Sequence, residues 1–171
     1  MCLIIIGNSG TGKSTFSTKL KTVSNYPLLQ LDSLWHTTDY SKKAKEWLID
    51  EQLSFMKQKN WIIEGNYQGT LPIRIAQADE IIWLKTTKLT AVSRVIKRSI
   101  QFRINKQSRP EMPSTFHEKF DRDYWEFLKF IWSYNEKEMA QLILANKKPH
   151  AKIIQLKNSK EKQNYLQKWG K

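Results

Sequence analysis

The chain of 171 residues has a single cysteine, Cys2, so no disulfide can form within it. Its 3 histidines and lone cysteine show none of the paired spacings that zinc sites require. These shortages argue against a disulfide-stabilised secreted scaffold and a zinc domain, and they favour a cytoplasmic protein.

Long hydrophobic runs are also missing. No stretch approaches the roughly 20 apolar residues needed to cross a membrane. The apolar run at residues 2–6 is too short for a signal-peptide core and follows no basic segment. Only 6 glycines and 5 prolines occur, with no internal repeat and no linker rich in Gly, Pro or Ser. We therefore expect one cytoplasmic domain over residues 1–171, with no membrane partner.

Acidic residues are scarce relative to basic ones. The chain has 29 Lys and Arg against 16 Asp and Glu, a formal net charge of +13. This charge attracts polyanions, so nucleic acid and phosphorylated small molecules are both candidate partners. A basic surface without a specific partner is also compatible with the composition. No helix-turn-helix or other DNA-binding motif occurs to decide between these interpretations.

Short apolar runs alternate with segments of helical periodicity, which predicts βαβ units and an α/β fold with a parallel sheet. Strands are expected at residues 3–6, 28–31, 61–63, 81–84 and 152–156. Helices are expected at 13–23, at 42–59, after residue 84, at 121–146 and up to 169, with a loop at 105–113. Right-handed crossovers place helices on both faces, and ligands of such sheets bind at the carboxyl ends of the strands.

Two of these helices have an expected buried face. The helix after residue 84 should bury Leu89, Val92, Ile96 and Ser99. In the segment 121–146, Tyr124, Leu128 and Ile131 form one stripe. This stripe favours core packing over base stacking by an aromatic-rich segment.

Residues 7–14 match the phosphate-loop pattern G-x-x-x-x-G-K-[ST] in full, directly after a β-branched strand and at the start of an amphipathic helix. Glycines let successive N–H groups turn toward phosphate oxygens, and the helix adds its positive end. We expect Lys13 to reach the β- and γ-phosphates as a catalytic residue, and the Ser14 hydroxyl to bind Mg²⁺. The predicted nucleotide-binding residues are Gly7, Asn8, Ser9, Gly10, Thr11, Gly12, Lys13, Ser14 and Thr15.

The expected cofactors are ATP and Mg²⁺. GTP remains an alternative to ATP, because the guanine signature Asn/Thr-Lys-x-Asp is missing but adenine is often recognised through the backbone. Glu64 ends the third expected strand, where an acidic residue beside the phosphate loop usually orients Mg²⁺, although a surface glutamate would fit the same pattern. Asp32 ends the second strand as a candidate catalytic residue that either holds the acceptor or accepts the proton of its hydroxyl. A turn or helix-capping aspartate is the alternative there.

Arg94, Lys97 and Arg98 share one face of the helix after the fourth strand. We assign Arg94 and Arg98 as catalytic candidates that neutralise charge on the transferred phosphoryl group, with Arg109 as a further candidate in a lid at about 97–120. A solvated basic face and a nucleic-acid patch are the alternatives. Arg74 is expected to contact either an acceptor phosphate or the carboxylates of Asp79 or Glu80.

The phosphate loop and residues 31–35, 61–67, 78–84, 94–98 and 108–112 together resemble the bacterial adenylate-kinase-related proteins called DNA topology modulation proteins. The resemblance covers nearly the whole chain. It implies a P-loop NTPase fold, with three α/β/α layers, a five-stranded parallel sheet ordered 2-3-1-4-5 and a helical lid. Adenylate kinases carry Asp-Gly-Phe-Pro-Arg after the third strand, whereas this chain has Glu64-Gly65-Asn66-Tyr67 and lacks the proline and arginine that bind AMP there.

The residues and the resemblance lead to one main expectation and two alternatives. The main expectation is an ATP-dependent phosphotransferase whose acceptor is a nucleoside, a nucleotide or another small molecule. A nucleotide-regulated nucleic-acid-binding protein that influences DNA topology is the first alternative. A plain NTPase is the second.

Overall fold

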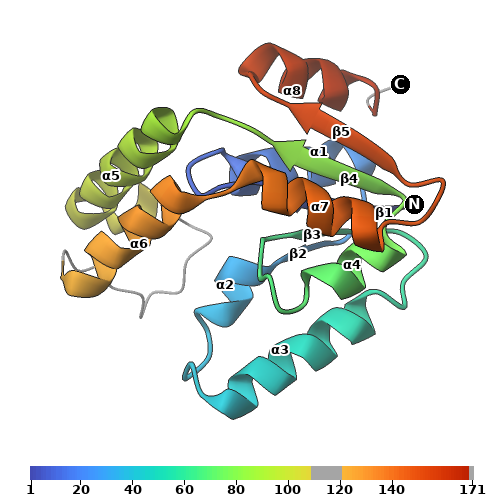
Figure 1. Ribbon diagram of the computed structural model, residues 1–171, viewed down its shortest axis with the longest axis horizontal. Helices are drawn as coiled ribbons and strands as arrows, with labels where there is room; N and C mark the ends of the chain where they lie inside the picture. The colour runs from blue at the N-terminus through green and yellow to red at the C-terminus, as the bar shows by residue number, and fades with distance from the viewer. Residues whose placement is uncertain (109–120, 170–171) are drawn as a thin grey trace.

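The computed structural model describes residues 1–108 and 121–169 around a parallel sheet with the strand order β2-β3-β1-β4-β5 (Figure 1). All four strand pairings in this sheet are parallel. The strands are β1 Cys2–Ile6, β2 Leu28–Gln30, β3 Trp61–Glu64, β4 Glu80–Leu84 and β5 Lys152–Leu156. The five-stranded α/β fold and its strand order are therefore confirmed.

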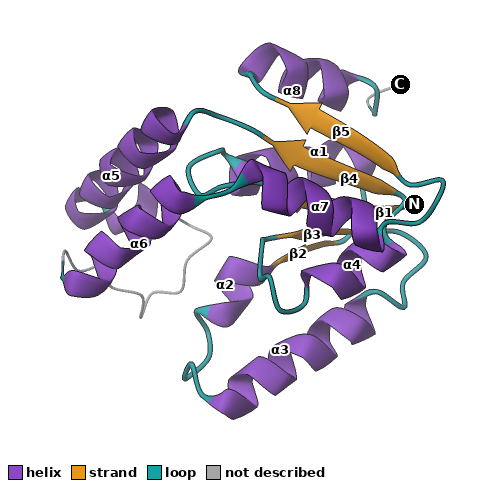
Figure 2. Ribbon diagram, viewed as in Figure 1, coloured by secondary structure: helices purple, strands orange, loops and turns teal. Residues whose placement is uncertain are grey.

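Helices cover both faces of the sheet (Figure 2). They are α1 Lys13–Ser24, α2 Leu31–Trp35, α3 Lys42–Phe55, α4 Leu71–Gln77, α5 Lys88–Ile104, α6 Arg122–Ser133, α7 Glu136–Asn146 and α8 Ser159–Gln167, with a 3₁₀ turn at Lys106–Ser108. Helices α1 and α8 pack on one face, and α3, α4 and α7 pack on the other. Helices α5 and α6 pack on each other beyond the carboxyl ends of the strands (Figure 1).

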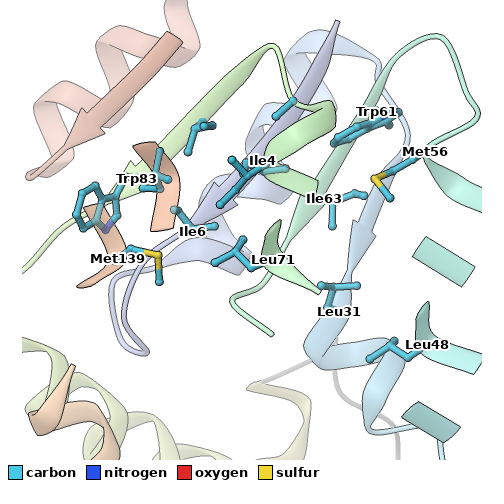
Figure 3. Packing of buried hydrophobic residues seen from close by; sticks show 14 residues of the cluster. Ile4, Ile6, Leu31, Leu48, Met56, Trp61, Ile63, Leu71, Trp83 and Met139 are labelled. Carbon is cyan, nitrogen blue, oxygen red and sulfur yellow. The ribbon is translucent and has the colours of Figure 1, made fainter. Parts of the chain in front are cut away.

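Side chains of β1 alternate between the two faces, as a strand requires. Leu3 and Ile5 join the cluster under α1 and α8, whereas Ile4 and Ile6 join the cluster under α3, α4 and α7 (Figure 3). The central strands are apolar on both faces because both faces are covered. Fixed in this way, the carboxyl end of β1 is a rigid support for the loop that follows it.

The expected helix at 121–146 is two helices in the structure. The first ends at Ser133, and Asn135 caps the second, since its side-chain oxygen accepts hydrogen bonds from the amides of Lys137 and Glu138. The three-residue spacing from Asn135 to Glu138 is a helix-start signal that the sequence prediction missed. The predicted stripe of Tyr124, Leu128 and Ile131 is buried as expected.

One helix was not predicted, and two further expectations were wrong in detail. Helix α4 was not predicted, because it has only seven residues and a proline in its first turn. Helix α3 ends at Phe55 instead of near residue 59, since the next residues form turns. Leu89 is 71% exposed, and Ala91 and Val95 form the buried face of α5 together with Ser99.

The second expected strand is shorter than predicted. Strand β2 ends at Gln30, and the fully buried Leu31 begins the short helix α2. Asp32 therefore lies in the first turn of a helix instead of at the end of a strand.

Residues 109–120, with Arg109 and half of the expected lid at 97–120, lie outside the described residues, so the lid stays a prediction. Residues 97–104 of that range are the second half of α5. Within the described residues, no helix is both long enough and apolar enough to cross a bilayer.

Candidate active site

Residues 7–12 form the loop between β1 and α1. Gly7 has a φ of +144° and Gly10 a φ of +79°, conformations that residues with a Cβ rarely adopt. A Cβ on Gly7 would lie 2.2 Å from the Leu84 carbonyl oxygen, and one on Gly10 would lie 2.4 Å from the Ala91 carbonyl oxygen. The end of β4 and the first turn of α5 therefore approach the loop so closely that only glycine fits at these positions.

Two buried polar side chains hold the loop in place. Asn8 donates from Nδ2 to the Ile131 carbonyl oxygen at 2.7 Å, and its Oδ1 accepts from the Ser9 amide at 2.8 Å. The Thr11 hydroxyl donates to the Asn8 carbonyl oxygen at 2.7 Å. Because both side chains are engaged inside the protein, we expect Asn8 and Thr11 to serve a ligand only through the backbone that they position.

The N-terminal end of α1 is open. Gly12, with a φ of +86°, stands at the N-cap position, and no side chain caps the helix. The first N–H groups of a helix have no partner within it, and the helix dipole adds positive charge at this end. The amides of Lys13, Ser14 and Thr15 belong to this first turn. The arrangement suits phosphate oxygens.

The Lys13 side chain folds back over the loop and is 8% exposed. Its Nζ donates to the Gly7 carbonyl oxygen at 2.9 Å and to the Asn8 carbonyl oxygen at 3.2 Å. These contacts hold a positive charge directly against the phosphate loop. We expect phosphate oxygens of a bound nucleotide to join or replace these acceptors.

Ser14 and Glu64 meet beside the loop. The register of the sheet places Glu64 next to Ile5 of β1 on one side and Gln30 of β2 on the other. The Ser14 hydroxyl donates to Glu64 Oε2 at 3.3 Å, while Glu64 Oε1 is buried without a hydrogen-bond partner. A fully buried carboxylate with one oxygen unpartnered is costly, so this atom indicates a missing partner.

These oxygen donors fit Mg²⁺. Mg²⁺ is usually held by one or two protein oxygens, with water and substrate phosphates completing its coordination. Within the described ranges, no group of three or more His, Cys, Asp or Glu side chains is arranged to hold a metal without such help. Ser14 and Glu64 would therefore hold the ion only together with a nucleotide, and their role as Mg²⁺ ligands stays a prediction.

The environment of Glu64 opposes its ionisation. The pKa of this carboxyl is raised from 4.5 to about 7, mainly by burial and to a smaller extent by the nearby Asp32 charge. Lys13, the Ser14 hydrogen bond and Arg74 act in the opposite direction. A bound cation would favour the ionised form, which is the form that binds a metal.

This shift predicts how the stability of the ligand-free protein changes with pH. Below pH 4.5 Glu64 is protonated in both states, whereas between pH 4.5 and 7 only the folded state holds the proton. The free energy of unfolding therefore falls as pH rises through this window, by on the order of 3 kcal/mol by pH 8. Chemical denaturation of wild type and Glu64→Gln at intervals from pH 4.5 to 8 measures the difference.

We expect the stability of wild type relative to Glu64→Gln to fall across that pH range. Glu46→Gln, at an exposed position on α3, is the matched control and should follow wild type. Parallel curves for wild type and Glu64→Gln would contradict the burial of an ionisable Glu64.

Asn66 joins the end of β3 to the phosphate loop. Its Oδ1 accepts from the Gly7 amide at 3.1 Å, and its Nδ2 donates to the Gly7 carbonyl oxygen at 2.9 Å. The Asn66 side chain thus hydrogen-bonds to both the amide and the carbonyl oxygen of Gly7, whose backbone conformation only glycine adopts readily. The sequence prediction gave Asn66 no role, because nothing in the local pattern shows that it reaches back to residue 7.

Arg74 is a structural residue in this fold. It is fully buried, and its guanidinium donates to the carbonyl oxygens of Gly65 at 2.6 Å, Asn66 at 3.0 Å and Tyr67 at 3.1 Å. Burial lowers the pKa of Arg74 to about 10, against the opposing effects of nearby acidic groups. The expected ion pair of Arg74 was wrong, because Asp79 pairs with Lys148 and Glu80 accepts from the Tyr165 hydroxyl.

Asp32 lies on the other side of Glu64 from the phosphate loop. Its side chain is exposed and accepts no hydrogen bond within the described residues, so it does not cap α2. Its charge acts on Glu64, Tyr67 and Arg74, which places it near all three. Burial, followed by the Asp32 charge, raises the pKa of Tyr67, so its hydroxyl stays protonated.

Basic side chains approach the loop from two helices. Arg94 of α5 is exposed, with Nη1 3.5 Å from the Gly10 carbonyl oxygen. Lys162 of α8 donates from Nζ to the Thr11 carbonyl oxygen at 2.6 Å, and burial lowers its pKa. Arg98 is half-buried and lies one helical turn beyond Arg94 along α5. Lys162 was not predicted, because one lysine among 29 basic residues carries no local signal.

No protein-family model matches the chain, and no curated protein matches it. Solved structures do match it over nearly its whole length. A protein from Chloroflexus aurantiacus proposed to be a kinase has a TM-score of 0.60 at 16% identity, over 97% of this chain and 95% of the other. Shikimate kinase from Bacteroides thetaiotaomicron has a TM-score of 0.58 at 14% identity, over 98% of this chain and 95% of the other. Deoxyadenosine kinase from M. mycoides with bound dATP has a TM-score of 0.53 at 17% identity, over 100% of both chains.

Identities this low show a shared fold, which is that of P-loop kinases. A nucleic-acid partner gains no support from these structures. The DNA-topology name attached to the sequence resemblance is not confirmed. The roles of individual residues in the cleft stay predictions.

Proposed function

We propose that the chain transfers the γ-phosphoryl group of ATP, bound with Mg²⁺, to a hydroxyl group of a small molecule. One observation carries this proposal. At a single edge of the sheet, the phosphate loop with Lys13 and the Ser14–Glu64 pair lie beside an exposed carboxylate, Asp32. A nucleotide site next to a free general base suits transfer to an acceptor.

The nucleotide half of the site supplies charge and alignment. The amides of the first turn of α1 and the Lys13 ammonium would hold the phosphates, while Ser14 and Glu64 would hold Mg²⁺. The metal, when bound, neutralises charge on the β- and γ-phosphate oxygens. Arg94 and Arg98 are the candidates for stabilising the transferred group, with Arg94 already at the loop.

The acceptor half supplies the base. The acceptor oxygen attacks the γ-phosphorus, the bond to the oxygen that bridges the β- and γ-phosphorus atoms breaks, and ADP leaves. The hydroxyl proton passes to the Asp32 carboxylate, which is exposed and free to accept it. No serine or cysteine nucleophile is needed, because transfer to the acceptor is direct.

The proposal is tested by ATP consumption with Mg²⁺ against a panel of nucleosides, nucleoside monophosphates and small polyols. We expect one acceptor class to stimulate turnover, and Asp32→Asn to lower the stimulated rate about 100-fold with ATP affinity unchanged. Asp50→Asn, at an exposed position on α3, is the matched control and should behave as wild type.

Two outcomes would contradict the proposal. Phosphate release that no acceptor stimulates, at a rate unaffected by Asp32→Asn, would favour a plain NTPase. Failure of Mg²⁺–ATP to bind at all would remove the nucleotide site itself. Calorimetry with a non-hydrolysable ATP analogue separates these two cases.

A further inference from the structure

Aromatic rings gather near Asp32, which shares α2 with Trp35 and whose charge acts on Tyr67. Trp35 and Tyr40 meet edge to face, with centroids 5.4 Å apart and planes at 68°. Trp35 also meets Tyr67 edge to face at 6.2 Å and 68°. The rings come from α2, from the turn before α3 and from the segment after β3, so three parts of the chain converge here.

The turn before α3 is strained at Tyr40, which has a φ of +61°. A bulky residue rarely adopts this conformation, and it costs energy. The turn brings the Tyr40 hydroxyl to 3.1 Å from His36 Nδ1 and the ring onto Trp35, yet leaves Tyr40 50% exposed. Strain that keeps the Tyr40 ring half in solvent indicates a binding surface here, formed on partly buried rings of Trp35 and Tyr67 that also pack against the core.

The charges near Asp32 and the aromatic rings are unsuited to an anionic acceptor. Asp32 is an exposed carboxylate, whereas Glu64 is fully buried and is the candidate Mg²⁺ ligand, so the exposed acidic group on this side of the site is Asp32. Arg74, whose charge is affected by both Glu64 and Asp32, is fully buried and donates to three backbone carbonyl oxygens. A phosphate or carboxylate on the acceptor would meet the negative charge of Asp32, while the hydrogen bonds described for Arg74 all go to backbone carbonyl oxygens.

From this arrangement we infer that the acceptor is an uncharged nucleoside, a sugar with a flat heterocycle and a free hydroxyl. The heterocycle packs against Trp35 and Tyr67, and the hydroxyl donates to Asp32. This inference rests on the proposed function and narrows its acceptor class. The reacting hydroxyl loses its proton to Asp32 and gains the γ-phosphoryl group, so the product is a nucleoside monophosphate and ADP.

Ring packing and acceptor charge should each change kcat/KM by an amount that can be measured. Packing of a base on an aromatic side chain contributes about 1–3 kcal/mol. Loss of the ring at Trp35 should therefore lower kcat/KM for a nucleoside roughly 5- to 150-fold. Like charge on the acceptor is a repulsive specificity element. We expect a nucleoside monophosphate to be used at least about 100-fold less well than its parent nucleoside.

The experiment compares purine and pyrimidine nucleosides, their 5′-monophosphates and ribose as acceptors for wild type, Trp35→Leu and Trp35→Phe. Trp47→Leu, at a 39% exposed position on α3 outside the ring cluster, is the matched control. We expect nucleosides to exceed both other classes, Trp35→Leu to lose that preference, and Trp35→Phe to recover most of it. ATP affinity should be the same in all four proteins, which shows that each is folded.

Binding is measured in parallel, so that the inference does not depend on turnover. Calorimetry with Mg²⁺ and a non-hydrolysable ATP analogue gives the affinity for each acceptor. The inference is supported if wild type binds the nucleoside more tightly than the other acceptors and Trp35→Leu does not. This result would hold even if turnover is absent and the proposed function fails. The inference is overturned if the monophosphate binds as tightly as the nucleoside or more tightly, if ribose is used equally well, or if Trp35→Leu has no effect. Transfer of phosphate to a monophosphate or to ribose would still leave the proposed function intact.

Discussion

Replacing Lys13 with methionine is expected to lower phosphoryl transfer from ATP by about 100- to 1,000-fold. The substitution keeps most of the apolar stem and removes the ammonium that lies against the Gly7 and Asn8 carbonyl oxygens. Removing one preorganised donor from developing negative charge typically has an effect of this size. Steady-state kinetics with the best acceptor, together with calorimetric titration of ATP, separates the loss of rate from the loss of binding.

Lys21→Met is the matched control, because Lys21 is an exposed lysine in the last turn of the same helix. It should retain the rate and the ATP affinity of wild type. If Lys13→Met were as active as Lys21→Met, the loop would not be the site of triphosphate chemistry, and the proposed function would fall with it. A thermal melt of each variant shows whether a loss of activity reflects unfolding.

Gly7→Ala is expected to destabilise the protein by about 3 kcal/mol or more and to abolish nucleotide binding. Two independent effects add at this position: a φ that alanine adopts only with strain, and a Cβ placed 2.2 Å from the Leu84 carbonyl oxygen. In a protein of this size, the melting temperature should fall by roughly 6–12 °C. Thermal unfolding followed by circular dichroism, with and without Mg²⁺–ATP, measures both losses.

Gly69→Ala provides the control for the same change of residue type. No atom lies within 4 Å of the position where its Cβ would be, and Gly69 is not among the glycines with positive φ. Its stability should stay within about 0.5 kcal/mol of wild type. Equal stability of the two variants would mean that the loop does not pack against the end of β4.

The fold was predictable from sequence because its signals are local. Strands such as β1 and β4 are apolar runs of β-branched residues, and the phosphate loop sits at the junction of a strand and a helix, where its glycines and Lys13 can be identified from spacing. The parallel sheet then brings Glu64 beside that loop, since both follow the carboxyl ends of neighbouring strands. The boundary at Asn135 was equally local and was missed.

The supporting contacts could not be predicted, since they join residues far apart in the chain. Lys162 reaches Thr11 across 151 positions, and Asn66 reaches Gly7 across 59. The sequence suggested that Arg74 meets a phosphate or a carboxylate, whereas burial turns it toward backbone carbonyl oxygens. These contacts depend on how distant segments pack together, and the type of an individual residue does not specify that packing.

The two hydrogen bonds between Asn66 and Gly7 couple the binding affinities of the two substrates. It ties the phosphate loop to the segment that Arg74 fixes and on which Tyr67 stands, so the two halves of the cleft share one frame. A ligand that rigidifies one half prepares the other, and thermodynamic reciprocity makes the gain in affinity equal in both directions. Synergy between the two substrates would favour the ternary complex over ATP alone and so limit wasteful hydrolysis.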